Sequence, residues 1–457
     1  FAVPIRILWD NWEKFNGQQD NPDDSTDFLV PQMNAPAGGF PADSLADYFG
    51  LPVDVENIQI NSLWHRAYNL CYAEWFKDQN LIDNPVLDKG NGPDDPANYP
   101  LRRRGKRHDY FTSALPWPQK GPAVDIPVGG TAPVDVGTFT LQSDGNSPSM
   151  DSPDNQGVAK IMGLNSGQPY AALESTPAGF QGFQAGTYVN TGLELIGQGS
   201  ANLNQLTGAT INEWREAFQL QRMLERDARG GTRYTEILQA HFNVTSPDFR
   251  LQRPEFLGGG SARVNINPIA QTSSTDTTSP QGNLAAFGTV TANNHGFTKS
   301  FTEHSVIIGL VNIRADLTYQ QGIDRMFSRQ TRYDFYWPAL SHLGEQAILN
   351  QEIFAQGTAV DQDVFGYQER YAEYRYKPSK ITSKFRSIDP QSLDTWHLAQ
   401  DFESLPVLNE SFIEDNPPID RVITVQTEPH FLLDTYFSLK CARPMPVYSV
   451  PGLIDHF

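Results

Sequence analysis

The chain has 457 residues, of which 39% are hydrophobic and 11% aromatic, so it can bury a sizeable core in one large domain or in two or three smaller ones. Its formal net charge of −19 excludes a protein that coats nucleic acid with its whole surface, because such a surface repels phosphate. No run of about 18 apolar residues is present, which argues against insertion into a membrane, and the start of the chain does not resemble a signal peptide. The two cysteines, Cys71 and Cys441, lie far apart in sequence and indicate two buried free thiols in a reducing compartment.

Glycines (36) and prolines (33) are spread along most of the chain, a pattern that favours many short elements joined by fixed turns, as in a β-sandwich with long loops. The chain opens with a predicted strand over residues 2–9. A short helix is predicted over residues 43–49, with Gly50 as its C-terminal cap. A longer amphipathic helix is predicted to follow Asn61 as its N-cap, because apolar residues recur there at spacings of three and four, at Trp64, Ala67, Tyr68, Cys71 and Trp75.

A dense basic run comes next in a chain that is otherwise acidic. Five of the six residues from 102 to 107 are cationic, namely Arg102, Arg103, Arg104, Lys106 and Arg107. Lys and Arg side chains gain affinity for phosphate by releasing counterions, so these five residues are the predicted nucleic-acid contact. A solvated loop or a salt-bridge patch between subunits is the alternative. The nearby Tyr110, Phe111 and Trp117 can stack on unpaired bases, but core packing is their expected role.

The composition changes after Gly121. As far as Gly208 there is no arginine and only one lysine, Lys160, and small polar residues dominate. A stretch of this length without periodicity is either disordered or a large loop that carries short strands, and we interpret it as an insertion that projects from the body. Helical structure is predicted to resume at a capping box formed by Thr210 and Glu213 and to break at residues 230–231, with a second helix over residues 234–242.

The rest of the chain is predicted to be β-structure with long connections. Short runs rich in β-branched and aromatic residues are the strand candidates, at residues 305–311, 331–337, 422–426 and 436–440. The prolines within residues 441–448 remove backbone donors, so this tail is expected to pack in extended form over a neighbouring surface.

Motifs of catalysis and metal binding are not found. The sequence has no phosphate loop, no GxSxG elbow and no HExxH pair, and the nearest approach, His342 to Glu345, has a single histidine. The nine histidines are scattered, and those beside a carboxylate are expected to be structural. We therefore predict no catalytic residue, no cofactor and no metal, and no enzymatic activity.

Several long blocks, in the same order and spread over nearly the whole chain, resemble the major capsid protein of the gokushoviruses, within the Microviridae. They are residues 108–121 (HDYFTSALPWPQKG), 224–235 (LERDARGGTRYT), 246–260 (SPDFRLQRPEFLGGG), 296–304 (GFTKSFTEH), 332–345 (RYDFYWPALSHLGE), 365–380 (FGYQERYAEYRYKPSK) and 441–457 (CARPMPVYSVPGLIDHF).

This resemblance implies a mainly β fold, a viral jelly roll made of an eight-stranded antiparallel sandwich with long loop insertions and a few short helices. Its copies would form a T=1 icosahedral shell around a circular single-stranded DNA genome, assembled in the cytoplasm of a bacterial host. The implied partners are further copies of the chain, an internal scaffolding protein, a small DNA-binding protein and a host cell-surface receptor. Members of the family carry a further N-terminal portion, so we expect the first strands of the jelly roll to lie outside this sequence.

The same resemblance implies three regions. Residues 1–124 and 208–457 would form the jelly-roll body, the latter with the extended C-terminal tail, and residues 125–207 would form a variable insertion that protrudes at the threefold axes. We expect the insertion to contact the host surface, with Phe180, Phe183 and Tyr188 as candidate contacts.

Two other classes of protein stay open at this point. A secreted, carbohydrate-binding jelly roll would need a signal peptide or clustered carboxylates for calcium. A cupin-type metalloenzyme would need two or three histidines that converge at one barrel mouth.

Overall fold

A computed structural model of the chain describes residues 1–17, 29–125, 210–275, 277 and 280–443, together with the backbone of short strands between residues 134 and 201. The chain divides into two compact units, and each is described by itself. The first comprises Phe1–Pro122 and Met223–Phe457, and the second comprises Ala123–Arg222.

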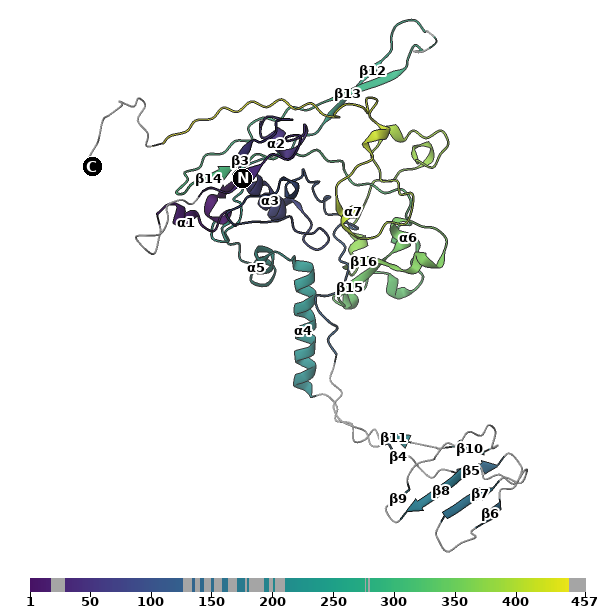
Figure 1. Ribbon diagram of the computed structural model, residues 1–457. Coiled ribbons are helices and arrows are strands. Elements are labelled where there is room, and N and C mark those ends of the chain that lie inside the picture. Colours follow the sequence, from purple (N-terminus) through teal and green to yellow (C-terminus); the bar gives the residue numbers. More distant parts are fainter. Residues whose placement is uncertain are drawn as a thin grey trace. The chain divides into compact units, whose positions relative to one another are not determined.

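Strands of the first unit form separate antiparallel pairs (Figure 1). Some of these pairs join segments that are distant in sequence, which brings the start of the chain beside residues 305–307. The pairs are β1 (Ala2–Pro4) with β14 (Ser305–Ile307), β2 (Gln32–Asn34) with β3 (Gln59–Asn61), β12 (Asn265–Ala270) with β13 (Leu284–Thr289), and β15 (Glu345–Leu349) with β16 (Val364–Glu369).

The second unit contains the remaining described strands, all in antiparallel pairings. Two pairs and one four-stranded sheet are present. The pairs are β4 (Val134–Asp135) with β11 (Ser200–Ala201) and β5 (Thr140–Ser143) with β10 (Leu193–Ile196), and the sheet runs in the order β6 (Ser149–Asp151), β7 (Val158–Met162), β8 (Ala171–Thr176) and β9 (Gly179–Phe180).

The described helices are mostly single turns. They are α1 (Trp12–Phe15), α2 (Leu45–Tyr48), α3 (Leu63–Cys71), α4 (Ile211–Gly230), α5 (Tyr234–Phe242), α6 (Asn350–Ile353) and α7 (Glu410–Ile413), and a π-helical turn over Tyr72–Phe76 continues α3.

Local capping signals place several of these helices where the sequence predicts them. The helix α2 begins at Ser44, whose side chain accepts a hydrogen bond from the Asp47 amide, and is followed by Gly50 with a positive φ of +80°. The capping box before α4 is confirmed, because the Thr210 hydroxyl accepts from the Glu213 amide at 3.2 Å and the Glu213 carboxylate accepts from the Thr210 amide at 2.6 Å. The helix α5 spans the predicted residues.

Two apolar clusters form the core of the first unit. The first packs α3 against β1 and β14, and its fully buried members include Val3, Trp9, Met33, Ala67 and Cys71. The second packs the β15–β16 pair against residues 110–114 and α7, with Ile348, Ile353 and Ile413 as its most buried side chains. The predicted core roles of Tyr110 and Phe111 are thereby confirmed, because both are buried in this second cluster.

Other predictions from apolar patterning were wrong. Trp64 is 45% exposed, whereas His65, Arg66 and Asn69 of the same helix are buried, because α3 is enclosed on most sides. Inside, Arg66 and Asn69 find hydrogen-bond partners, and the His65 ring packs edge-on against Phe49 and Tyr99. In α4 the apolar side chains of Ile211, Trp214 and Phe218 are exposed, and Ala228 is its buried residue. Of the two cysteines expected to be buried, Cys71 is buried and Cys441 is exposed.

Two of the predicted strands are confirmed in part. Only the first three residues of segments 2–9 and 305–311 form strands, namely β1 and β14. Residues 332–334 form a 3₁₀ turn instead of a strand, because the Asp334 carboxylate accepts hydrogen bonds from the amides of Gln330 and Thr331 and so favours a local turn. Residues 422–426 and 436–440 form no strand.

Small sheets and a few helices therefore make up the described part of the chain, in agreement with a mainly β protein. The sheets described have two to four strands, and none of them closes. The eight-stranded jelly roll stays a prediction.

Candidate nucleic-acid interface

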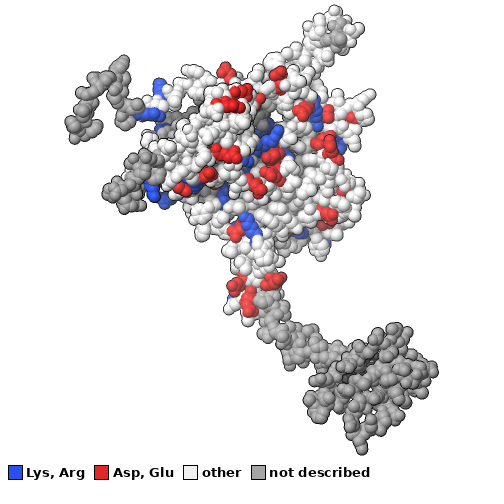
Figure 2. Space-filling view, in the orientation of Figure 1, with Lys and Arg blue, Asp and Glu red and all other residues white. Residues whose placement is uncertain are grey.

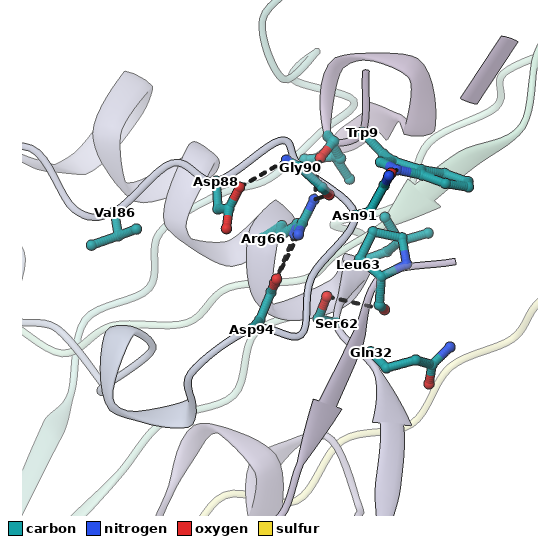
Figure 3. Close-up of polar contacts among 12 residues, drawn as sticks. Trp9, Gln32, Ser62, Leu63, Arg66, Val86, Asp88, Gly90, Asn91 and Asp94 are labelled. Atoms are coloured by element: carbon teal, nitrogen blue, oxygen red, sulfur yellow. Dashed lines mark hydrogen bonds and ion pairs between the residues drawn. The ribbon is translucent and has the colours of Figure 1, made fainter. Parts of the chain in front are cut away.

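A buried ion pair fixes the segment that leads into the basic run. Arg66 of α3 binds Asp94 through two parallel hydrogen bonds of 2.7 and 2.5 Å, and the two side chains are 2% and 1% exposed (Figure 3). The Tyr99 hydroxyl donates to the same carboxylate at 2.8 Å, and Arg66 also donates to the carbonyls of Leu8 and Gly90. Burial acts to raise the pKa of Asp94, but the hydrogen bonds from Arg66 and Tyr99 outweigh it and hold that pKa below its ordinary value.

The helix α3 and its π-helical turn then hold the basic run along one side. Each of these hydrogen bonds uses a backbone group of the run. The contacts are Arg102 N to the Tyr68 hydroxyl (2.9 Å), the Tyr72 hydroxyl to Arg103 O (2.9 Å) and Gly105 N to Phe76 O (2.9 Å).

The other side of the run pairs with residues 413–415, the last residue of α7 and the two that follow it. Asp415 N donates to Arg104 O, and Lys106 N donates to Ile413 O, both at 2.8 Å. The Lys106 ammonium turns inward, donates to Phe412 O at 2.5 Å and lies 4.5 Å from the centre of the Phe412 ring. Burial lowers the pKa of Lys106. Lys106 thus packs against the core and offers no free ammonium to a phosphate in this chain.

The other four predicted cations remain at or near the surface. Arg102 and Arg104 are half-buried and lie 5.5 and 5.3 Å from the ring centres of Tyr72 and Phe76. Two more, Arg103 and Arg107, are exposed and each has one polar partner: Arg103 donates to the Asn416 side chain at 2.9 Å and Arg107 to Asp316 at 3.0 Å.

A further cation, Arg314, joins this group. Burial lowers the pKa of Arg104, and the nearby positive charges of Arg314 and Arg107 lower it further. The pKa of Arg314 is lowered in the same way, by burial and then by Arg107. Three guanidinium groups are therefore close enough to repel one another. No local signal in the sequence marks Arg314, because it lies far along the chain from the basic run.

The carboxylate of Asp415 lies beside these cations. Burial raises its pKa, and Lys106, Arg314 and Arg104 oppose that rise. With Asp316 also present, the cations are partly neutralised, and on the face shown in Figure 2 basic and acidic side chains are interspersed. The geometry thus offers a small cluster of arginines that can bind a phosphate, within a surface that is acidic overall.

The predicted host contacts fall in the second unit. Phe183 and Tyr188 lie outside the residues that the structure describes, and Phe180 is described only as the backbone end of β9.

No group of three or more His, Cys, Asp or Glu side chains that could hold a metal ion occurs within the described part of the chain. None of its described helices is both long and apolar enough to cross a membrane.

Comparison with known proteins gives matches along the whole chain. Residues 1–453 match the family described as "Capsid protein (F protein)". The capsid protein VP1 of Bdellovibrio phage phiMH2K is 50% identical over 100% of this chain and 85% of its own length. The VP1 proteins of Chlamydia phage 1 and Spiroplasma virus 4 are 43% and 39% identical, each over 99% of this chain and over 85% and 84% of their own lengths.

These matches define the class as structural proteins of bacteriophage capsids. The chain belongs to the capsid protein (F protein) family, among the gokushoviruses of the Microviridae. The predicted resemblance is confirmed, and the protein is a component of the virion.

Proposed function

We propose that the chain is the major subunit of a T=1 icosahedral shell that encloses circular single-stranded DNA, and that it folds as a jelly roll and has no enzymatic activity. The observation that carries this proposal is the match to capsid proteins over the whole chain. An internal scaffolding protein, a small DNA-binding protein and assembly in the host cytoplasm complete the proposal.

Exposed apolar side chains support a role in assembly. Residues 424–443 run without a helix or strand, and within them Leu432, Tyr436 and Phe437 are 100%, 91% and 80% exposed. Large apolar groups gathered on a surface mark sites of contact with other proteins. This segment is therefore a natural supplier of contact area between subunits, where obligate interfaces commonly bury about 2,000 Å² or more.

We propose three regions in the assembled subunit. Residues 1–124 and 208–457 form the body, and residues 125–207 form a protrusion that contacts a host receptor. The contacts proposed for Phe180, Phe183 and Tyr188 rest on the composition of this segment.

The genome-facing site is proposed at the arginine cluster. Of the five cations predicted from the sequence, Arg103 and Arg107 have exposed side chains, Arg102 and Arg104 are half-buried, and Lys106 is turned into the core. The neighbouring Arg314 adds positive charge that the sequence alone did not indicate.

Replacing Arg103 and Arg107 by Gln tests this site. Both side chains are exposed, and the Asp316 partner of Arg107 is 90% exposed, so the fold loses little. We expect particles of the double variant to carry less DNA, measured by their absorbance at 260 and 280 nm. The matched control replaces the exposed Arg250 and Arg263 by Gln, which changes the net charge by the same amount. Equal DNA content in both variants would refute the assignment.

A further inference from the structure

The hairpin formed by β12 and β13 has no described element packed on either of its faces. Every residue of both strands is exposed. A two-stranded hairpin alone is marginally stable in water, because neither face buries apolar surface. In Figure 1 the hairpin extends away from the other labelled elements of the first unit. A partner that covers one face would provide the missing burial.

The register shows that one face is wholly apolar. Directly opposed residues of an antiparallel pair share a face, and faces alternate along each strand. One face therefore carries Ile266, Pro268, Ala270, Leu284, Ala286 and Gly288. The other face is mixed, with Asn265, Asn267, Ile269, Ala285, Phe287 and Thr289.

Side-chain positions agree with this assignment. A Cβ placed on Gly288 would lie 3.3 Å from the Ile266 Cδ1, so the Ile266 side chain lies across Gly288 on the apolar face. On the other face the Asn267 side chain donates to the Thr289 hydroxyl at 3.4 Å. The two faces thus differ in chemistry and can be tested separately.

Charge indicates which partner covers the apolar face. Between residues 264 and 290 the sequence has a single charged residue, Asp276, in a chain with a net charge of −19. Figure 2 shows the described part of this hairpin free of acidic and basic side chains. Two copies of an acidic chain repel each other wherever their charged surfaces meet, and interface cores are depleted of charged residues. A neutral, apolar face suits contact with another copy of the same chain.

We propose that the apolar face of the β12–β13 hairpin docks on a second copy of the chain during shell assembly. This inference rests on the proposed function, because it assigns one contact within the proposed shell. Six residues of one hairpin cover only part of a stable interface, so the hairpin acts together with other contacts between the same subunits.

The adjacent alanines Ala285 and Ala286 provide a matched test, because they are exposed neighbours on opposite faces. Ala286→Glu places a carboxylate in the proposed contact, where its burial is costly, and Ala285→Glu makes the same change on the mixed face. We expect A286E to raise the subunit concentration needed for shell formation at least about tenfold, and A285E to assemble as the unchanged chain does. Both variants should keep the melting temperature of the unassembled subunit.

Sedimentation velocity measures the fraction of each variant that assembles into shells, and so distinguishes the possible outcomes. If A286E forms shells as well as the unchanged chain does, the inference about the hairpin is overturned, but the proposed function is not. If A286E and A285E lose shell formation equally, the assignment to this face is overturned. Absence of shells from the unchanged chain would overturn the proposed function instead. A photo-crosslinker at residue 286 then identifies the partner by mass: a product of two chains supports a second copy, and a product with another protein or with DNA refutes it.

Discussion

At Arg66 and Asp94 the chain places a full ion pair inside its core. Taking two charges out of water is expensive, and the pair is held only because each group also binds other partners: Tyr99 on the carboxylate, and two backbone carbonyls on the guanidinium. This pair joins α3 to the segment that leads into the basic run. The position of the arginine cluster therefore depends on residues that never touch a phosphate.

Asp94→Asn is expected to destabilise the unassembled subunit by about 3–5 kcal/mol, because it leaves a buried guanidinium without its counterion. Arg66→Met with Asp94→Leu removes both charges and is expected to cost less than the single change. Urea unfolding followed by circular dichroism measures both variants. A single variant as stable as the unchanged chain would show that the pair is not buried.

His65 adds a dependence of stability on pH. Burial lowers its pKa from 6.5 to about 4, and the Asp94 charge opposes this only in part. The unfolded chain then binds a proton near pH 6.5 while the folded chain does not, so stability is full above pH 6.5 and falls as the pH drops toward 4. The loss reaches about 3 kcal/mol at most.

His65→Gln is expected to flatten this part of the stability profile. The measurement is the midpoint of urea unfolding at intervals between pH 4 and pH 7, for the unchanged chain and the variant. If the two profiles fall in parallel, His65 is not the group that titrates.

At the scale of elements, local signals were predictable and long-range pairing was not. The bounds of α4 and α5 follow from a capping box and a glycine pair, which act within a few residues. The strand predicted over residues 331–337 was wrong because the hydrogen bonds of the Asp334 side chain favour a turn. The pattern of apolar residues carries no information on such side-chain hydrogen bonds. The basic run was predictable because five cationic residues lie within six positions. The burial of Lys106 and the closeness of Arg314 to the run were not, because they depend on segments that only the fold brings together.

The turn between α4 and α5 depends on Gly231. Its φ is +108°, and a Cβ there would lie 2.3 Å from a carboxylate oxygen of Glu236, which accepts the Arg233 amide at the start of α5. We expect Gly231→Ala to destabilise the subunit by about 1–3 kcal/mol. Gly296→Ala is the control, since nothing lies within 4 Å of a Cβ at that position. Thermal melting compares the two, and equal melting temperatures would contradict this account of the turn.

At the scale of the whole molecule, the described part of this chain leaves many large apolar side chains exposed. The apolar face of the β12–β13 hairpin and the segment 424–443 both expose side chains that a protein acting alone would bury. A shell subunit has a reason for such surfaces, because its neighbours cover them. The family match and the exposed surfaces therefore lead to the same conclusion, a protein whose function is carried by contacts with its own copies.

The most direct test of that conclusion is electron cryomicroscopy of the chain expressed in bacteria, alone and together with the other structural genes of its phage. The account predicts closed particles of one diameter whose reconstruction shows T=1 icosahedral symmetry, with the β12–β13 hairpin at a contact between two subunits. Soluble monomers in both preparations, or particles without icosahedral order, would contradict it.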